Sequence, residues 1–292
     1  TKTTVTETTW PPAVVRAPRI QESAQLDPYV IPALIDTITT DQYQYKYLEE
    51  TTYTNNAAPT AEGSALGENA LAFTERTEEI RKIGAFIPMT EELLADVSAA
   101  QGYIDSRLRF MVRQTISDQI IGGSGSGVNL TGILNKTGIN SFNYSSFSGS
   151  LKRIGQIFEA ITEIQKDAFM NPDAIIMHPS DWYQVVTEVN AVTTSGALNP
   201  LFVGAGNFND AVRPSIWGVP VVVSTETTAG DCIVGTFGGG QAIHIVARQG
   251  MEVAMSDSHD ENFVKDIVVM KATVRMGLPI YRATAFAKIS NF

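Results

Sequence analysis

The sequence predicts an α+β protein with a long extended projection, and three observations lead to this prediction. The stretch from about residue 43 to residue 87 shows the two-residue alternation of strands around a turn-rich middle, and one long helical pattern follows it directly. The middle of the chain then alternates helical and strand patterns, whereas long alternating strands occupy the chain from about residue 242. No internal repeat of roughly 20–50 residues is visible.

Residues 1–36 are expected to form an N-terminal arm. The first nine are mostly threonine, and Trp10-Pro11-Pro12 opens a proline-dense stretch that disfavours a regular helix and favours extended chain on a surface. Leu34, Ile35 and Ile38 are expected to anchor the end of the arm. A disordered tail is the alternative, and the apolar content of the stretch leaves the two interpretations equally open.

The stretch 43–87 is expected to run out as one strand, turn at a small-residue tip from Pro59 to Asn69, and return as a second strand. Alternating tyrosines mark the outgoing strand: Tyr43, Tyr45 and Tyr47. The returning strand begins at Ala70 in this interpretation and is stopped by Pro88. Its later apolar positions are Ile80, Ile83 and Phe86.

A two-stranded arm of about forty residues cannot bury a core of its own, because an isolated hairpin is marginal in water. The arm must therefore lie on something else, and a compact monomer leaves nothing for it to lie on. This reasoning points to a neighbouring copy of the same chain. We therefore expect a shell or assembly protein rather than an enzyme.

One long helix follows the arm. Thr90 is expected to be its N-cap with Glu91 and Glu92 in the first turn, and the main rod runs from about Ser98 to Ile121, about 35 Å. The spacing of three and four residues puts six apolar side chains on one face: Ile104, Leu108, Met111, Val112, Ile116 and Ile120. We expect a core helix without chemistry of its own.

Two glycine-rich stretches are expected to be joints rather than nucleotide sites. Gly122 to Gly127 ends the helix, but it lacks the Gly-Lys-Ser/Thr step that enters the helix of a phosphate-binding loop. We therefore expect a flexible joint there, and likewise at Gly238-Gly239-Gly240 between two strand patterns.

The remaining chain is expected to contain α/β elements and then long strands. We expect a helix over 150–169, a buried strand over 174–177, a helix opened by Pro179, a loop over 192–212, and strands at 216–223 and 232–235. The helix over 150–169 should bury one face, formed by Leu151, Ile154, Ile157, Phe158, Ile161 and Ile164. The final strands are expected at 244–247, 251–255, 264–270, 274–278 and 280–289, with a polar tip at 256–262.

Composition excludes several classes of function. The net charge of −10 argues against a protein that grips nucleic acid through phosphates, but it is compatible with one that encloses nucleic acid. No apolar run approaches the ~18–20 residues of a membrane span, and the N-terminus does not resemble a signal peptide. The first residue is Thr1. An engineered start, removal of Met or proteolytic processing of a precursor would each explain it.

Candidate chemical residues favour structural roles. The single cysteine, Cys232, excludes an intramolecular disulfide and a cysteine-based zinc site, and its strand context favours a buried small hydrophobe. His178 precedes Pro179-Ser180-Asp181, which is no catalytic triad because triad members come from separate elements, so Ser180 or Asp181 is expected to start a helix. His244 is expected to be a core or edge histidine.

The remaining polar clusters are expected to be solvated. His259 lies within Asp257 to Asn262, where a loose oxygen cation site is the alternative to a turn, although the spacing of a calcium-binding loop is missing. The carboxylate pairs Glu49-Glu50, Glu78-Glu79 and Glu91-Glu92 are expected to be surface charge. We therefore expect no catalytic, cofactor-binding or metal-binding residues and no enzyme.

Several motifs, in this order and spacing, resemble one family. They are 53–57 with Ala61-Glu62, 101–108, 121–133, 179–182, 217–222, 262–265 and 281–285. Together they resemble the major capsid proteins of tailed bacteriophages, the Hong Kong 97 bacteriophage-like fold that encapsulins share. The likeness covers nearly the whole chain, and no single motif is decisive.

The resemblance implies a fold of four parts. These are an N-terminal arm (1–36), an extended β-hairpin loop (43–87), a peripheral domain with a long spine helix (37–42, 88–130 and 241–276) and an α/β axial domain (131–240 and 277–292). It also implies a precursor from which an N-terminal scaffolding segment is removed.

The resemblance also concerns a covalent cross-link. Some members join a lysine on the extended loop to an asparagine in the peripheral domain, assisted by a glutamate. The corresponding positions here are Leu66, Asp266 and Thr273, and the loop tip has no lysine. We therefore expect no autocatalytic cross-link, and stability from noncovalent overlap or a cementing protein.

The implied function is that of a major capsid protein. It would assemble into hexamers and pentamers of an icosahedral virion shell around double-stranded DNA, in the host cytoplasm, with portal and decoration proteins as partners and without a membrane. A protein-cargo shell of the encapsulin type is the alternative, and the Thr- and Pro-rich arm favours the phage. An enzyme would need a pocket with convergent titratable groups, which the sequence does not supply.

Overall fold

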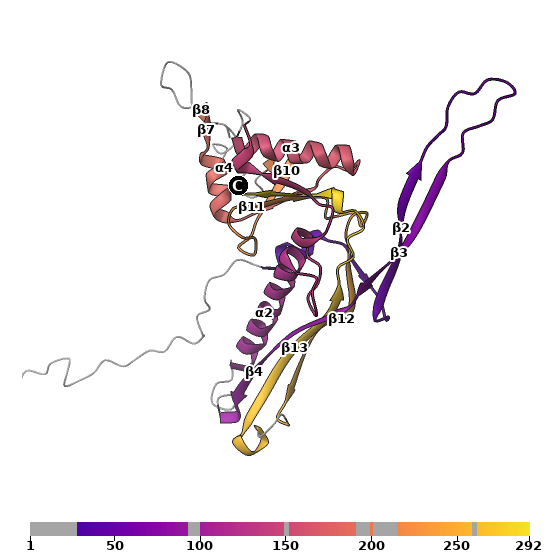
Figure 1. Cartoon of the computed structure of the whole chain (residues 1–292). Coiled ribbons are helices and arrows are strands. Elements are labelled where there is room, and N and C mark those ends of the chain that lie inside the picture. The colour runs from indigo at the N-terminus through magenta and orange to yellow at the C-terminus, as the bar shows by residue number, and fades with distance from the viewer. Residues whose placement is uncertain (1–27, 93–99, 149–151, 191–198, 201–214, 259–261) are drawn as a thin grey trace, which may run out of the picture.

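The computed structural model describes residues 28–92, 100–148, 152–190, 199–200, 215–258 and 262–292. These residues form two β-sheets with packed helices, and a two-stranded hairpin that projects away from both (Figure 1). One continuous hydrophobic core runs through the two sheets and their helices. The predicted α+β class is confirmed, whereas the boundaries of the four predicted parts stay a prediction.

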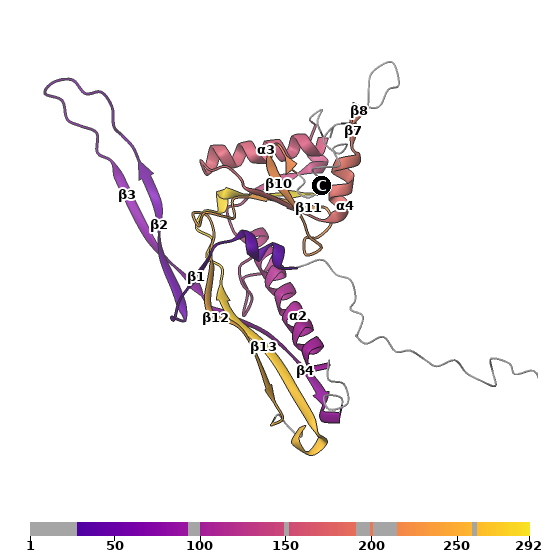
Figure 2. The ribbon, with the colours of Figure 1, turned by 180° about the vertical axis from the view of Figure 1, so that it is seen from behind.

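A four-stranded sheet and one long helix form the first layer pair. The strand order is β1 (Thr37–Thr39), β12 (Ile245–Ser256), β13 (Ile267–Gly277) and β4 (Arg81–Thr90). Helix α2 (Ala100–Gly122) packs against β4 and β13, and lies along these strands in both views (Figures 1 and 2). The opposite face of this sheet is not covered by any described element.

Helix α2 buries the predicted stripe with one exception. Leu108, Val112, Ile116 and Ile120 are buried and Ile104 is partly buried against the core, but Met111 is 42% exposed, so its placement on the core face was wrong. The buried residues advance in steps of four, and Met111 lies one residue, about 100°, away from that line. The predicted cap at Thr90 is followed by helical residues 91–92, and the continuation lies outside the described residues.

The end of the N-terminal arm is packed against α2. Two short 3-10 turns, η1 (Pro28–Val30) and η2 (Pro32–Leu34), bury Ile31 and Ile35 in the core. The guanidinium of Arg113 on α2 lies 5.2 Å from the ring centre of Tyr29. The predicted anchor is therefore present, and residues 1–27 lie outside the described part of the chain.

The returning strand of the hairpin ends earlier than predicted. Strand β3 (Ala70–Glu79) stops at the base of the hairpin, and β4 starts a new strand in the four-stranded sheet. Pro88 does not stop β4, because it lies within the ladder opposite Val269. Strand β4 is an edge strand, where the missing N–H of a proline is tolerated if it faces the open side.

The late strands are fewer and longer than predicted. The patterns at 244–247 and 251–255 belong to one strand, β12, whose register shifts between Ala247 and Glu252 join the two parts. The pattern expected from residue 264 begins only with β13 at Ile267. The 3-10 turn η6 (Asn262–Lys265) and the positive φ of 50° at Asp266 precede it.

A six-stranded sheet forms the second part. Its order is β5 (Asn140–Asn143), β14 (Phe286–Ser290), β11 (Asp231–Gly235), β6 (Ala174–Met177), β10 (Val219–Val223) and β9 (Ser215–Ile216). The predicted buried strand β6 is confirmed, since all four residues are buried. The other described elements are α3 (Lys152–Asp167), α4 (Pro179–Thr187), β7 (Val189–Asn190), β8 (Asn199–Pro200), η3 (Ile133–Asn135), η4 (Tyr144–Ser146) and η7 (Ala283–Ala285).

Helix α3 covers this sheet with the described part of its predicted apolar face, apart from Phe158, while Leu151 lies outside the described residues. It packs against β14, β11 and β5 and buries Ile157 and Ile164 completely. Phe158 was expected in the core but is half-exposed, and its ring lies 4.9 Å from that of Trp217, centre to centre. Phe158 adjoins Ile157 in the sequence, so it points about 100° away from the buried stripe.

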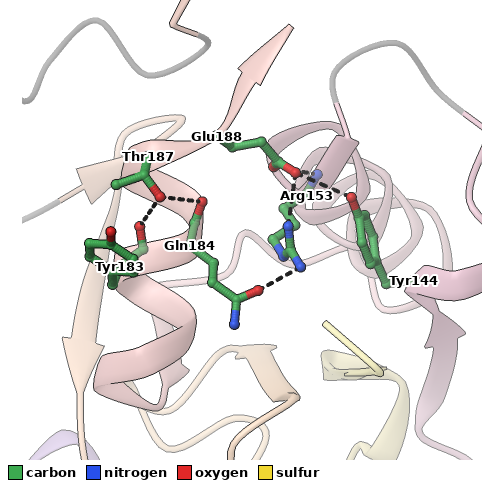
Figure 3. A network of polar contacts seen from close by, with 6 residues as sticks. All are labelled: Tyr144, Arg153, Tyr183, Gln184, Thr187 and Glu188. Atoms are coloured by element: carbon green, nitrogen blue, oxygen red, sulfur yellow. Dashed lines mark hydrogen bonds and ion pairs between the residues drawn. The ribbon is translucent and has the colours of Figure 1, made fainter. Parts of the chain in front are cut away.

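A polar network ties α3, α4 and η4 together (Figure 3). The guanidinium of Arg153 donates to Oε1 of the buried Glu188 at 2.9 Å and to Oε1 of Gln184 at 2.7 Å. The Tyr144 hydroxyl donates to the same Glu188 oxygen at 3.2 Å, and the guanidinium lies 4.6 Å from the Tyr144 ring centre. These partners compensate most of the burial of the ion pair, and Nε of Arg153 is the one buried guanidinium nitrogen without a hydrogen-bond partner among the described residues.

The glycine-rich joint after α2 is a hydrogen-bonded turn, not the flexible joint that was expected. The N–H of Gly125 donates to the Leu130 carbonyl and the N–H of Gly132 to the Gly123 carbonyl, both at 2.9 Å. The Asn135 side chain donates to the carbonyls of Gly122 and Gly123. A side chain at Gly132 would collide with backbone atoms of Gln119, Ile121 and Gly123, so the glycines allow close packing.

This packing predicts opposite effects at two glycines. Gly132→Ala should lower the free energy of unfolding by about 1–3 kcal/mol, because the surrounding backbone must move. Gly102→Ala, in α2 with open space around its Cβ position, should be neutral or raise it by about 0.5–1 kcal/mol. Urea unfolding of the dispersed protein measures both, and equal effects of the two substitutions would contradict the described turn.

A pair of carboxyl groups connects the two parts of the molecule. Asp118 on α2 and Glu226, in the connection between β10 and β11, share a hydrogen bond, and Gln114 also hydrogen-bonds Glu226. Burial and the neighbouring Asp118 raise the pKa of Glu226 from 4.5 to about 7. The folded protein therefore holds a proton here that the unfolded chain releases at lower pH.

The raised pKa of Glu226 predicts a pH-dependent stability. The contribution of the pair is complete below about pH 4.5 and is lost as the pH rises through about 7, because the folded state then ionises two adjacent carboxyl groups. Glu226→Gln should therefore gain stability relative to the unchanged protein between pH 5 and pH 8. Thermal unfolding over this range, with the exposed Glu159→Gln as control, measures the difference; parallel curves for all three proteins would contradict it.

Candidate functional site

The projecting hairpin is the main candidate for a functional surface. Strands β2 (Gln44–Thr54) and β3 pair from Gln44 opposite Glu79 at the base to Thr54 opposite Ala70 near the tip. The hairpin points away from both sheets in the two opposite views (Figures 1 and 2). The predicted arm and its turn-rich tip are therefore confirmed, although the sequence did not show which face would be free.

A β-bulge at Thr51 gathers the apolar side chains of the hairpin on one face. Side chains of a strand alternate between faces, and one extra residue reverses the alternation. The ladder passes from Glu50 opposite Phe73 to Thr52 opposite Ala72, which leaves Thr51 extra. We call the resulting set the apolar stripe: Leu48, Tyr53, Leu71 and Phe73, which are 70%, 71%, 59% and 61% exposed.

The opposite face of the hairpin carries polar groups and the contacts with the subunit itself. Arg76 donates to Glu49 at 2.6 Å across the two strands. Nearer the base, the ring of Tyr47 meets that of Tyr281 edge-on at 4.7 Å. The apolar stripe therefore faces away from the side on which the hairpin contacts its own subunit.

The tip of the hairpin is held by asparagine side chains. The N–H of Asn56 donates to Oδ1 of Asn69, and its side chain donates to the Glu68 carbonyl, both at 2.7 Å. Leu66 is 83% exposed between these contacts. The tip is thus a closed turn that presents an apolar side chain to solvent.

The hairpin is strongly acidic. Residues 43–79 contain two basic and seven acidic residues, a net charge of −5. Both basic residues are already paired within the hairpin, Lys46 with Glu75 at 2.5 Å and Arg76 with Glu49 at 2.6 Å. Unpaired carboxylates therefore dominate the field around the stripe.

The open face of the four-stranded sheet carries basic and apolar groups, which complement the acidic charge and the apolar stripe of the hairpin. A groove of about 520 Å³ crosses it, lined among others by Lys82, Gly84, Phe86, Lys271 and Thr273. A Cβ atom at Gly84 would lie 2.8 Å from the Ala272 carbonyl oxygen, so the glycine keeps the floor of the groove low. Phe86 is 61% exposed, which gives the groove both basic and apolar groups.

The three family cross-link positions occupy different places in one chain. Thr273 lies in the groove on β13, and Asp266 precedes this strand, where its carbonyl accepts a hydrogen bond from the Glu91 N–H. Leu66 lies at the tip of the hairpin, outside the groove lining. A single subunit therefore does not bring the three positions together.

Cys232, His178 and Asp181 have structural roles in the described fold. Cys232 is fully buried in β11, and burial raises the pKa of its thiol. His178, rather than Ser180 or Asp181, is the N-cap of α4, because its side chain accepts from the Ser180 N–H; Asp181 is buried and accepts from the Gly230 N–H at 2.8 Å. The sequence could not show this, because Gly230 is distant in the chain.

Glu78 and His244 both lie near the base of the hairpin. Glu78 was expected to be plain surface charge, but it is half-buried at the hairpin base, and burial raises the pKa of its carboxyl group. His244 lies against Tyr281, with the ring centres 5.6 Å apart. His259 lies outside the described residues. Within the described ranges, no group of three potential metal ligands occurs and no helix is long and apolar enough to cross a membrane.

Comparisons with known proteins agree with this geometry. A model of the phage capsid family matches residues 16–291. The major capsid protein of Enterobacteria phage HK97 is 28% identical over 243 residues, which are 83% of this chain and 60% of that protein. The chain thus spans about three fifths of the length of this relative.

Solved structures share the fold over almost the whole chain. The capsid of a native GTA particle superposes with a TM-score of 0.76 at 14% identity, covering 97% of this chain and 96% of the other. A structure from Mycobacterium phage Ogopogo gives a TM-score of 0.72 at 18% identity and covers 99% of both chains. At such identities these structures speak for the fold alone.

Proposed function

The chain belongs to the phage capsid family, and from this premise we propose that it is the major capsid protein of a tailed bacteriophage. In this role it assembles into hexamers and pentamers of an icosahedral shell around double-stranded DNA. The observation that carries the proposal is the apolar stripe, four exposed side chains on a hairpin with no core beneath it. A second subunit would remove these side chains from water.

Burial of the apolar stripe would contribute favourably to assembly. Full burial of a Leu or Phe side chain contributes about 1.5–3 kcal/mol, and each subunit of a closed shell repeats the contact. Hairpin and groove also have opposite charge, since the hairpin is acidic while Lys82 and Lys271 line the groove. We therefore place the hairpin of one subunit over the open sheet face of its neighbour.

Charge also supports a wall around DNA rather than a DNA-binding surface. With a net charge of −10, the protein repels the phosphate backbone overall, so packaged DNA would remain mobile against it. The family match and the likeness to the capsid protein of Enterobacteria phage HK97 favour a phage shell over a cargo compartment of the encapsulin type. Portal and decoration proteins are the further partners in this proposal, assembly takes place in the host cytoplasm, and no enzymatic role is proposed.

The apolar stripe predicts an assembly defect without unfolding. Replacing Leu71 and Phe73 by serine should weaken subunit association by about tenfold or more, because two large apolar side chains no longer leave water. Sedimentation and negative-stain microscopy measure the yield of particles. Ala72→Ser, on the opposite face of the same strand, should assemble normally. Normal particle yield from the double variant would exclude the stripe as a subunit contact.

We further propose that the shell contains no isopeptide cross-link between subunits. Leu66 has no amine to attack with, and Asp266 has no amide from which ammonia could leave. Assembled particles boiled in SDS should therefore migrate as a single band of about the chain mass, 31.6 kDa. A covalent ladder that persists after boiling would disprove this, and mass spectrometry of its tryptic peptides would identify the bond.

A further inference from the structure

The base of the hairpin rests on residues 277–281, the end of β13 and the first residues after it. The covalent connection between the hairpin and the four-stranded sheet is short, because Ile80 alone separates β3 from β4. Its N–H donates to the Tyr43 carbonyl at 3.2 Å, which closes the base of the hairpin. Rotation at the φ and ψ angles of this one residue can still tilt the hairpin, so the contacts at its base also help to set its direction.

Two tyrosines of β2 make the main contacts with this segment. The Tyr47 ring packs edge-on against Tyr281, and its hydroxyl donates to the Ile280 carbonyl at 3.5 Å. The Tyr281 hydroxyl donates to the Tyr45 hydroxyl at 3.3 Å. Tyr45 and Tyr47 lie on the same face of the hairpin, opposite the apolar stripe.

Strand β3 also contacts the segment 277–281. Glu78, directly opposite Tyr45 in the ladder, accepts a hydrogen bond from the Leu278 backbone. Gly277 lies directly beside β3, since a Cβ atom there would be in van der Waals contact, at 3.5 Å, with Cγ of Glu78 and with the Glu79 carbonyl oxygen. Both strands of the hairpin therefore touch the segment 277–281.

The segment itself is fixed to the core of the subunit. Leu278 and Ile280 are buried, and Ile280 forms a β-bridge with Ile243. The N–H of Tyr281 donates to the Ala242 carbonyl at 2.8 Å. The segment under the hairpin is thus tied to the core of the subunit by burial and hydrogen bonds.

We propose that Tyr45, Tyr47 and Glu78 form a latch with residues 277–281 that fixes the direction of the hairpin in the free subunit and turns the apolar stripe outward. The inference rests on the proposed function, because the direction matters only if the stripe must reach another subunit. An arm held in its binding direction loses less conformational freedom on assembly than an arm that swings. The latch therefore determines the angle at which the hairpin approaches a neighbouring subunit and the face of the hairpin that contacts it.

The tyrosine hydroxyl groups of the latch do not titrate near neutrality, and Glu78 is its one carboxyl group, with a pKa that burial raises. Burial raises the pKa values of Tyr47 and Tyr281 above their usual range, so both hydroxyl groups stay protonated at neutral pH. The aromatic contact does not depend on ionisation.

Distance measurements between spin labels test the latch in dispersed subunits. One label at Leu66→Cys marks the tip and a second at Glu159→Cys, exposed on α3, marks the body, while the native Cys232 is buried and stays unlabelled. The unchanged latch should give one narrow distance distribution. Tyr47→Ala removes a ring that belongs to the hairpin. It should broaden the distance distribution by about twofold, because the contact with Tyr281 that restrains the hairpin is lost.

Further variants separate the latch from general damage. Tyr281→Ala should broaden the distribution as Tyr47→Ala does, and Tyr281→Phe, which keeps the ring, should broaden it less. Tyr183→Ala, an exposed tyrosine of α4, should leave the distribution unchanged. Circular dichroism reports whether each variant is folded, and Tyr47→Ala keeps the test valid if Tyr281→Ala does not fold.

Two results would overturn the latch. One is a broad distribution in the labelled but otherwise unchanged protein, and the other is a narrow distribution in folded Tyr47→Ala. Both are obtained with dispersed subunits, so they do not depend on particle formation. Absence of particles from the unchanged protein would instead count against the proposed function, which keeps the two failures distinguishable.

Discussion

Apolar surface on a thin two-stranded ribbon is the constraint on which the rest of this structure depends. A ribbon has two faces, and it can shield neither of them by itself. One face is partly covered at the base by the subunit's own Tyr281, whereas the other carries the apolar stripe in solvent. A patch of this kind marks a surface that another molecule covers. In a protein that packs copies of itself into a closed wall, that molecule is the neighbouring copy.

Charge adds direction to this apolar contact. The hairpin has a net charge of −5, and its two basic residues are used within it, so it meets other surfaces as an acidic element. The open sheet face presents Lys82 and Lys271 around a groove that has Gly84 at its floor. Such complementarity contributes more to the choice of partner and register than to affinity. In the proposed contact, the apolar stripe would therefore supply affinity and the charges would select the partner.

The body behind the hairpin is tied together at several points between its parts. The turn after α2 is held by hydrogen bonds from Gly125, Gly132 and Asn135, and the buried pair of Arg153 and Glu188 joins two helices. A wall subunit needs this combination, because an arm transmits force and orientation only from a firm base. The carboxyl pair between α2 and the six-stranded sheet is the exception, since its contribution weakens as the pH rises.

The sequence alone determined the positions of the arm, the long helix and the buried strand β6, because each is written in a local period of two or about 3.6 residues. Only the tertiary structure decided what depends on partners distant in the chain. Pro88 is tolerated because β4 became an edge strand, and the extra residue at Thr51 sets the free face only through pairing with β3. His178 caps α4 while Asp181 holds Gly230. Such roles arise from packing between segments, which no local pattern specifies.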